Sequence, residues 1–91
     1  MIALTKHASI RAQQRDFSRE VCLFVAREGD VQKPARDGRR AVFISQHKVD
    51  TLASQGFNTA FLKEALRCVV VIARNAIVTV HDGAQMSRSF N

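Results

Sequence analysis

Two runs of β-branched residues near the carboxyl end of the chain, CVVVIA and AIVTV, are joined only by Arg74 and Asn75. Such runs around so short a connection are typical of a β-hairpin. Both faces of Val69–Ala73 are apolar. This strand is therefore either covered on both sides, or covered on one side and paired with a second copy of the chain on the other. The hairpin requires the chain to build a sheet.

The length of the chain, 91 residues, is that of one small domain. A domain of this size buries about 60–65% of its unfolded surface, which suits one core between two layers. We expect a single domain over 1–91, with an ordered core over 5–81 and a polar, flexible tail over 82–91.

The remaining segments predict helices and two further strands. Thr5 is a suitable N-cap for a first helix, and Ser18 caps a second, apolar helix. Gly29 is expected to end that helix in the left-handed backbone conformation. A strand near Val31 and a strand over RRAVFIS follow, with a loop between them.

Residues 46–66 follow helical patterns and form an insert. The predicted fold is therefore α+β. Two N-terminal helices pack on a four-stranded antiparallel sheet, and the helical insert lies between the second and third strands.

The first predicted helix carries a stripe of basic side chains. Because an α-helix turns about 100° per residue, Arg11 lies roughly 40° and Arg15 roughly 80° around the axis from His7. The residues best suited to water lie on the opposite side: Lys6, Ser9 and Gln13. This geometry predicts that the stripe occupies the middle of the face that packs on the sheet.

Buried arginine is costly unless it is paired or hydrated. In one arrangement, Arg11 and Arg15 extend past a helix of small residues and pair with carboxylates such as Asp30 or Glu28. In the other, they line an open groove between helix and sheet, where two guanidiniums and an imidazole meet a phosphodiester. The sequence leaves both arrangements open.

Two polar residues on the last predicted strand are further candidates. By the two-residue period of a strand, Thr79 and His81 share a face with Ile77, while Val78 and Val80 take the other. If the valines face the core, Thr79 and His81 point away from it.

A basic loop, QKPARDGRR, joins the first two predicted strands and is a candidate surface for binding a nucleic-acid backbone. Its cationic residues are Lys33, Arg36, Arg39 and Arg40. The whole chain has 14 Lys and Arg against 8 Asp and Glu, a formal net charge of +6. This balance favours a polyanionic partner such as RNA.

The segment TKHASIRAQQRDFSREV, with its H-A-x-x-R-x-x-x-R pattern, resembles a family of small bacterial domains of unknown function. That family is similar in turn to the barnase/EndoU/colicin/RelE superfamily, which includes ribonuclease toxins. The resemblance spans roughly Thr5 to His81, and the VVVIARNAIVTV hairpin fits it, but residues 46–66 have no counterpart.

The resemblance implies N-terminal helices packed on a four-stranded antiparallel sheet and metal-independent RNA cleavage. Carried over by position, the catalytic residues are His7, Arg11, Arg15, Thr79 and His81. RelE-type relatives use tyrosine near the carboxyl end, and this chain has no tyrosine.

Metal-independent RNA cleavage requires a base for the ribose 2′-OH, an acid for the leaving oxygen, and cations for the phosphate. Imidazole suits both proton roles because its ordinary pKa is about 6.5. Guanidinium suits the phosphate because it binds two oxygens at once. His7 with His81, and Arg11 with Arg15, would supply all of these groups.

The remaining chemistry-bearing residues predict neither a metal site nor a cofactor. The three His and two Cys show no spacing typical of metal ligands. Cys22 and Cys68 lie inside apolar runs, which favours buried free thiols in a reducing compartment. No segment resembles a signal peptide or a membrane span, so we expect a cytoplasmic protein that does not bind membranes.

Two functions fit the sequence. The first is a metal-independent endoribonuclease, as the toxin of a toxin–antitoxin pair with an antitoxin-like protein partner. The second is a non-catalytic domain of the same fold that acts through a protein partner or as a homodimer. The doubly apolar strand and the apolar insert around Phe57, Phe61 and Leu62 favour the second.

Overall fold

A computed structural model of the chain describes residues 2–83 as an α+β structure of four α-helices and a five-stranded mixed sheet. Of the tail predicted over 82–91, residues 84–91 lie outside the described residues. The elements are β1 (Ala3–Leu4), α1 (Lys6–Gln14), α2 (Arg19–Glu28), β2 (Val31–Pro34), a turn of 3-10 helix (Arg36–Gly38), β3 (Arg40–Phe43), α3 (Gln46–Ser54), α4 (Thr59–Arg67), β4 (Cys68–Ala73) and β5 (Ala76–Asp82).

The strands pair in the order β1-β5-β4-β3-β2. The pairs β2–β3, β3–β4 and β4–β5 are antiparallel, and β4 and β5 form the predicted hairpin. The prediction of a four-stranded antiparallel sheet is wrong, because β1 adds a fifth strand parallel to β5. The N–H of Thr5 donates to the carbonyl of Ile77 at 3.0 Å as the chain leaves β1. A strand of two residues is too short to show the alternation by which strands are found in a sequence.

Each α-helix begins at a side chain that accepts a backbone hydrogen bond. The predicted N-caps Thr5 and Ser18 accept from the N–H three residues later, at 3.1 Å in both cases. Ser45 and Asn58 do the same for the two helices of the insert, α3 and α4. These caps fix where the helices start and therefore how each meets the sheet.

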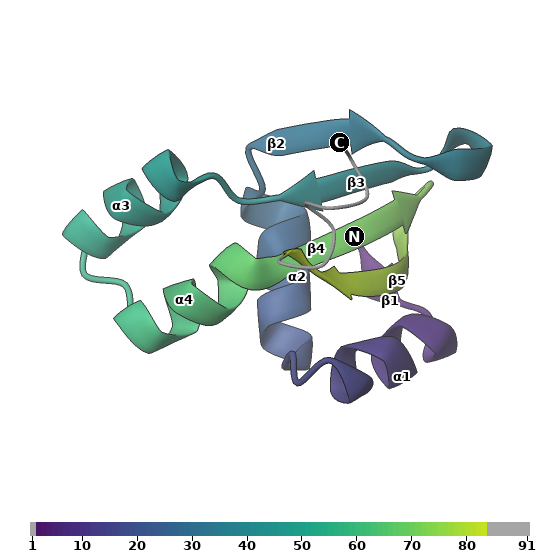
Figure 1. Cartoon of the computed structure of the whole chain (residues 1–91), viewed down its shortest axis with the longest axis horizontal. Helices are drawn as coiled ribbons and strands as arrows, with labels where there is room; N and C mark the ends of the chain where they lie inside the picture. Colours follow the sequence, from purple (N-terminus) through teal and green to yellow (C-terminus); the bar gives the residue numbers. More distant parts are fainter. Residues whose placement is uncertain (1, 84–91) are drawn as a thin grey trace.

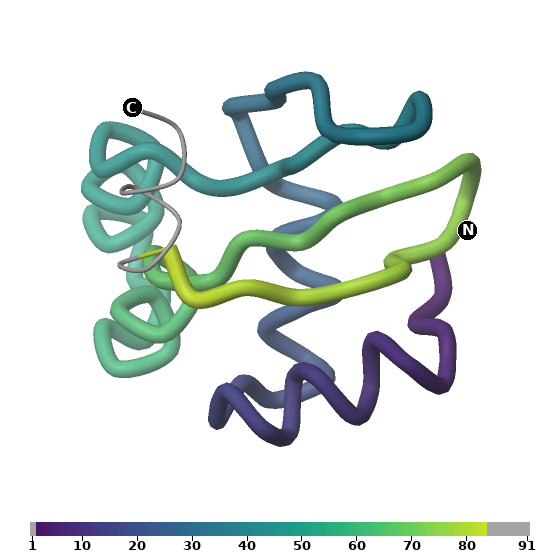
Figure 2. The backbone as a smooth tube through the Cα atoms, turned by 45° about the vertical axis from the view of Figure 1, so that its right-hand side comes forward, coloured from purple at the N-terminus to yellow at the C-terminus, as the bar shows by residue number. Residues whose placement is uncertain are grey.

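Helices α1 and α2 pack on the sheet, and α3 with α4 extend from one end of it (Figure 1). Figure 2 shows α2 crossing the strands on one side, with α1 alongside β5. The core lies between α2 and the sheet, and β4 is buried over Cys68–Ile72, as expected for a strand that is apolar on both faces. Cys22 and Cys68 are buried free thiols, as predicted. No helix in the described range, 2–83, is long and apolar enough to span a bilayer.

Gly29 does not adopt the predicted left-handed conformation, since its φ and ψ are −60° and 126°. The position requires glycine for a different reason. A Cβ atom there would lie 2.4 Å from Cγ1 of Val42 and 2.6 Å from the carbonyl oxygen of Val25. The end of α2 therefore passes so close to β3 that any side chain would collide.

Candidate functional site

The position of α1 is set by its smallest residues. Ala8 and Ala12 are 0% and 3% exposed, and both belong to the core that includes Ile77 and Val80 of β5. Alanine has no side chain beyond Cβ, so the helix backbone can approach the strand closely. β1 pairs only with the first two residues of β5, and α1 lies beside the strand where β1 has ended.

The prediction that His7, Arg11 and Arg15 occupy the middle of the buried face is wrong. His7 is exposed, while Arg11 and Arg15 are half-buried. The helix is turned so that its alanines face the sheet, because a long charged side chain can extend past an edge whereas its burial under a helix would be costly. The basic stripe therefore lies at the margin of the contact between α1 and β5.

The last strand contains a bulge that changes which residues share a face. Thr79 pairs with Val71 but Ile77 pairs with Ile72, so Val78 is an extra residue. As a result Ile77 faces the core together with Val80, not with Thr79 as the simple alternation predicted. Thr79 and His81 still point away from the core, as predicted, and both are half-buried.

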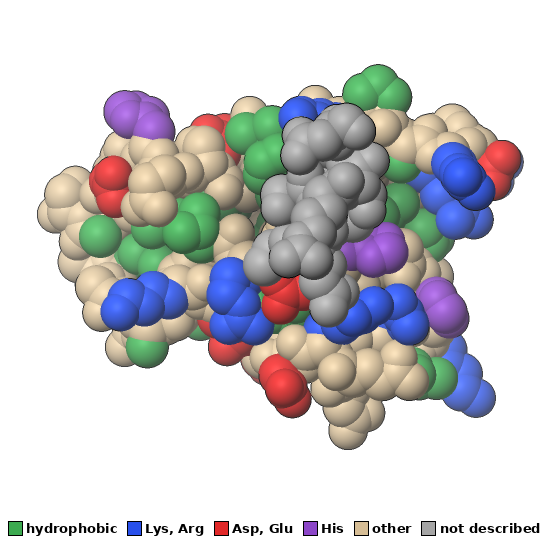
Figure 3. All heavy atoms as spheres, viewed as in Figure 1, with side chains coloured by type: hydrophobic (Ala, Val, Ile, Leu, Met, Phe, Trp, Pro, Cys, Tyr) green, Lys and Arg blue, Asp and Glu red, His purple; other side chains and the backbone are tan. Residues whose placement is uncertain are grey.

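The side chains of Arg11, Arg15 and His81 come together at this margin, and we call them the His–Arg cluster. Partial burial lowers the pKa of His81, and the positive charges of Arg11 and Arg15 lower it further. Arg11 also donates a long hydrogen bond to Gln14, at 3.4 Å. Figure 3 shows Lys and Arg side chains next to His side chains between α1 and β5. The cluster therefore presents a neutral imidazole beside two cations.

The alternative in which Asp30 or Glu28 neutralises these arginines does not occur. The carboxylate of Asp30 accepts hydrogen bonds from the N–H and hydroxyl of Ser45, at 2.8 and 2.6 Å, and these lower its pKa. Glu28 lies 3.9 Å from its own neighbour, Arg27. Both carboxylates are thus engaged elsewhere in the molecule.

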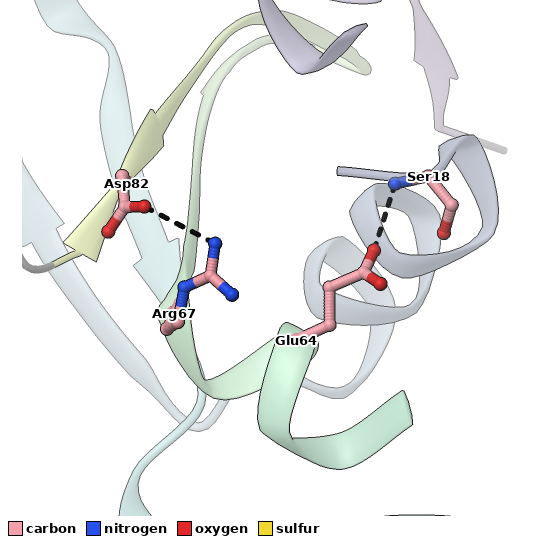
Figure 4. Close-up of polar contacts among 4 residues, drawn as sticks. All are labelled: Ser18, Glu64, Arg67 and Asp82. Atoms are coloured by element: carbon pink, nitrogen blue, oxygen red, sulfur yellow. Dashed lines mark hydrogen bonds and ion pairs between the residues drawn. The ribbon is translucent and has the colours of Figure 1, made fainter. Parts of the chain in front are cut away.

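The chain next to the cluster is held by contacts with α4 that the sequence did not reveal (Figure 4). Arg67 forms an ion pair with Asp82 at 3.4 Å, and its guanidinium lies over the ring of Phe17 at 5.2 Å. Glu64 accepts a hydrogen bond from the N–H of Ser18 at 2.9 Å. These contacts tie the α1–α2 connection and the end of β5 to the insert. They join residues 15 to 50 positions apart in sequence, so no local pattern signals them.

The other predicted site residues lie apart from the cluster. His7 is at the start of α1, about 12 Å along the helix axis from Arg15, so its pairing with His81 remains a prediction. Lys33, Arg36 and Arg39 are exposed around the β2–β3 hairpin. Arg40, the first residue of β3, is half-buried.

The β4–β5 turn adds a basic residue that is not among the site residues predicted from the sequence. Arg74 is exposed in this turn, with a φ of 57°. Its relation to the β2–β3 hairpin depends on strand register, which becomes visible only in the assembled sheet.

Comparisons of the chain with protein-family models, with curated proteins and with solved structures find no match. The functional interpretation therefore depends on the chemistry of the residues themselves.

Proposed function

We propose that the protein is a cytoplasmic, metal-independent endoribonuclease with a fold of the barnase/EndoU/colicin/RelE type, and that it acts as the toxin of a toxin–antitoxin pair. The observation that carries the proposal is the His–Arg cluster, in which a histidine with a lowered pKa lies beside two arginines. A neutral imidazole can accept a proton, and two guanidiniums can bind a phosphate. The net charge of +6 favours association with RNA.

The cluster suggests how cleavage would proceed. His81 accepts the proton of the ribose 2′-OH, whose oxygen attacks the adjacent phosphorus. Arg11 and Arg15 bind the non-bridging oxygens, which gain charge in the transition state. The P–O5′ bond breaks, and the leaving oxygen takes a proton from water. Thr79, on the same face of β5 as His81, donates a hydrogen bond to the phosphate.

The proposal is tested by incubating total RNA with the protein in EDTA. We expect cleavage by the wild type and a loss of about 100-fold or more for Arg11→Ala, since one preorganised donor to a developing charge contributes about 10²–10³ in rate. Lys63→Ala is the matched control, because Lys63 is an exposed cation on α4, which packs mainly against α2 and α3. Equal activity of the Arg11 and Lys63 variants, or no cleavage at all in EDTA, would reject the enzyme.

A second function is favoured by exposed apolar side chains. Phe57, between α3 and α4, is 42% exposed, and Ile10 on α1 is 46% exposed. A non-catalytic domain would use such residues to bind a protein partner or a second copy of itself. Sedimentation equilibrium, which shows whether the protein is a dimer, distinguishes the two functions. A stable dimer that protects Ile10 from hydroxyl-radical labelling would cover the helix beside the cluster and exclude RNA from it.

A further inference from the structure

Four arginines from distant parts of the chain meet at one end of the sheet. Arg40 pairs with Ile72 across β3 and β4, and the β4–β5 turn follows two residues later. This register places the tip of the β2–β3 hairpin beside the β4–β5 turn, as Figures 1 and 2 show. We call this surface the basic end. Its members are Arg36, Arg39, Arg40 and Arg74.

The charges of the basic end are not balanced. Within the described residues, 2–83, none of the four guanidiniums forms an ion pair. Asp37 is the only acidic residue in these two turns. Two carboxylates lie at the opposite end of the strands. Asp82 is opposite Cys68 in the β4–β5 ladder, and Asp30 directly precedes β2. Four like charges at one end of the sheet repel one another, and a bound polyanion would relieve that repulsion.

The backbone of Arg74 is a second, independent observation. Its φ of 57° lies in the left-handed region, which a residue with a Cβ atom adopts at a cost. Glycine and asparagine are the usual residues at such positions in hairpin turns. An arginine there lowers stability, and within residues 2–83 it makes no ion pair that would offset the cost. Such strain is typical of functional positions.

The basic end is connected to the His–Arg cluster by further basic residues. β5 leads from the turn to His81 over five residues, which at about 3.3 Å each is roughly 17 Å. α1 starts beside the first residues of β5 and carries Lys6 and His7, both exposed, before Arg11. Adjacent phosphates of an extended single strand lie farther apart than the roughly 3.4 Å axial spacing of a strand in a duplex, so fewer than about five nucleotides would cover this distance.

Resting on the proposed function, we infer that the basic end is a subsite that holds single-stranded RNA a few nucleotides away from the cleavage position. The strand must be single at the cluster, because in-line attack by a 2′-OH requires a backbone freed from A-form geometry. The four arginines bind phosphates, which are the same in every RNA, and none of the four positions offers an aromatic ring for a base to stack on. The basic end therefore holds RNA of any sequence.

The subsite is tested by binding 2′-O-methyl oligouridylates, which lack the nucleophile and cannot be cleaved. In the triple variant Arg36→Gln, Arg39→Gln, Arg74→Gln, we expect affinity for a dodecamer to fall by about 30-fold or more, while a dinucleotide loses less than about twofold. The slope of log K against log salt for the dodecamer should shrink by about 2, because each phosphate contact on a single strand contributes about 0.7. Lys48→Gln with Lys63→Gln, on α3 and α4, is the matched control and should leave both affinities unchanged.

Arg74 offers a test in which loss of binding cannot come from loss of folding. Arg74→Gly removes both the charge and the energetic cost of the positive φ, so the variant should melt at the same temperature or higher. It should nevertheless bind the dodecamer several-fold more weakly. Equal losses for both lengths, wild-type affinity of Arg74→Gly, or tighter binding of a duplex of the same length would overturn the subsite. Because uncleavable RNA is used, binding can persist when EDTA-resistant cleavage is absent. That result would reject the ribonuclease and keep the subsite.

Discussion

Replacing His81 with glutamine should slow RNA cleavage by about 10²–10⁴-fold, the usual contribution of a positioned acid or base. Glutamine keeps a polar side chain of similar reach on the same face of β5 but cannot accept a proton. The loss should therefore appear in kcat, and the melting temperature should change little because His81 is only half-buried. A variant that keeps wild-type kcat would show that His81 takes no part in proton transfer.

The pH dependence follows from the two arginines beside His81. Because burial and the charges of Arg11 and Arg15 lower its pKa, the base is neutral and active down to a pH below the ordinary histidine value. Arg11→Gln removes one positive charge, which makes protonation easier and raises the pKa of His81. The acidic limb of the pH–rate profile should then move to higher pH. Titration of the His81 ring by NMR measures the same shift without relying on activity, and Arg19→Gln on α2 is the matched control.

The largest effect on stability is expected for Gly29→Ala, which should lower the free energy of unfolding, measured in urea, by about 2–3 kcal/mol. The added Cβ would meet Cγ1 of Val42 at 2.4 Å and the backbone oxygen of Val25 at 2.6 Å. A side chain can turn away, but the Val25 carbonyl is held by its hydrogen bond from the N–H of Gly29 at 2.8 Å, so the backbone at the end of α2 would have to shift.

Gly38→Ala is the matched control for this substitution. A Cβ at Gly38 has no atom within 4 Å, and the cost there comes only from its φ of 72°. That cost is about 1 kcal/mol. If Gly29→Ala proved no more destabilising than Gly38→Ala, the close approach of α2 to β3 would not be the reason for the glycine.

The parts of the fold that the sequence predicts well are those fixed by neighbouring residues. The caps Thr5 and Ser18 and the hairpin at Arg74-Asn75 depend on short-range chemistry, and all are found in the structure. β1 was missed because it exists only through pairing with a strand more than 70 residues away.

The candidate site was predicted in part for the same reason. Residue spacing placed Arg11 and Arg15 on one side of α1, but the rotation of the helix depends on what it packs against. Two alanines allow a closer approach than the basic stripe, and this decided the orientation. The proximity of His81 to the arginines depends on β1 ending early and on the register of β5, neither of which is a local property.

Because Val78 is an extra residue in the β4–β5 ladder, β5 can lose it and still pair with β4. A gene that lost one codon there would encode a regular strand in which Val80 still points inward and the imidazole outward. Gaining a codon between Val80 and His81 would instead turn the imidazole toward the hydrophobic interior. Loss of one residue at the bulge therefore preserves which side chains of β5 face the core, whereas gain of one residue after Val80 does not.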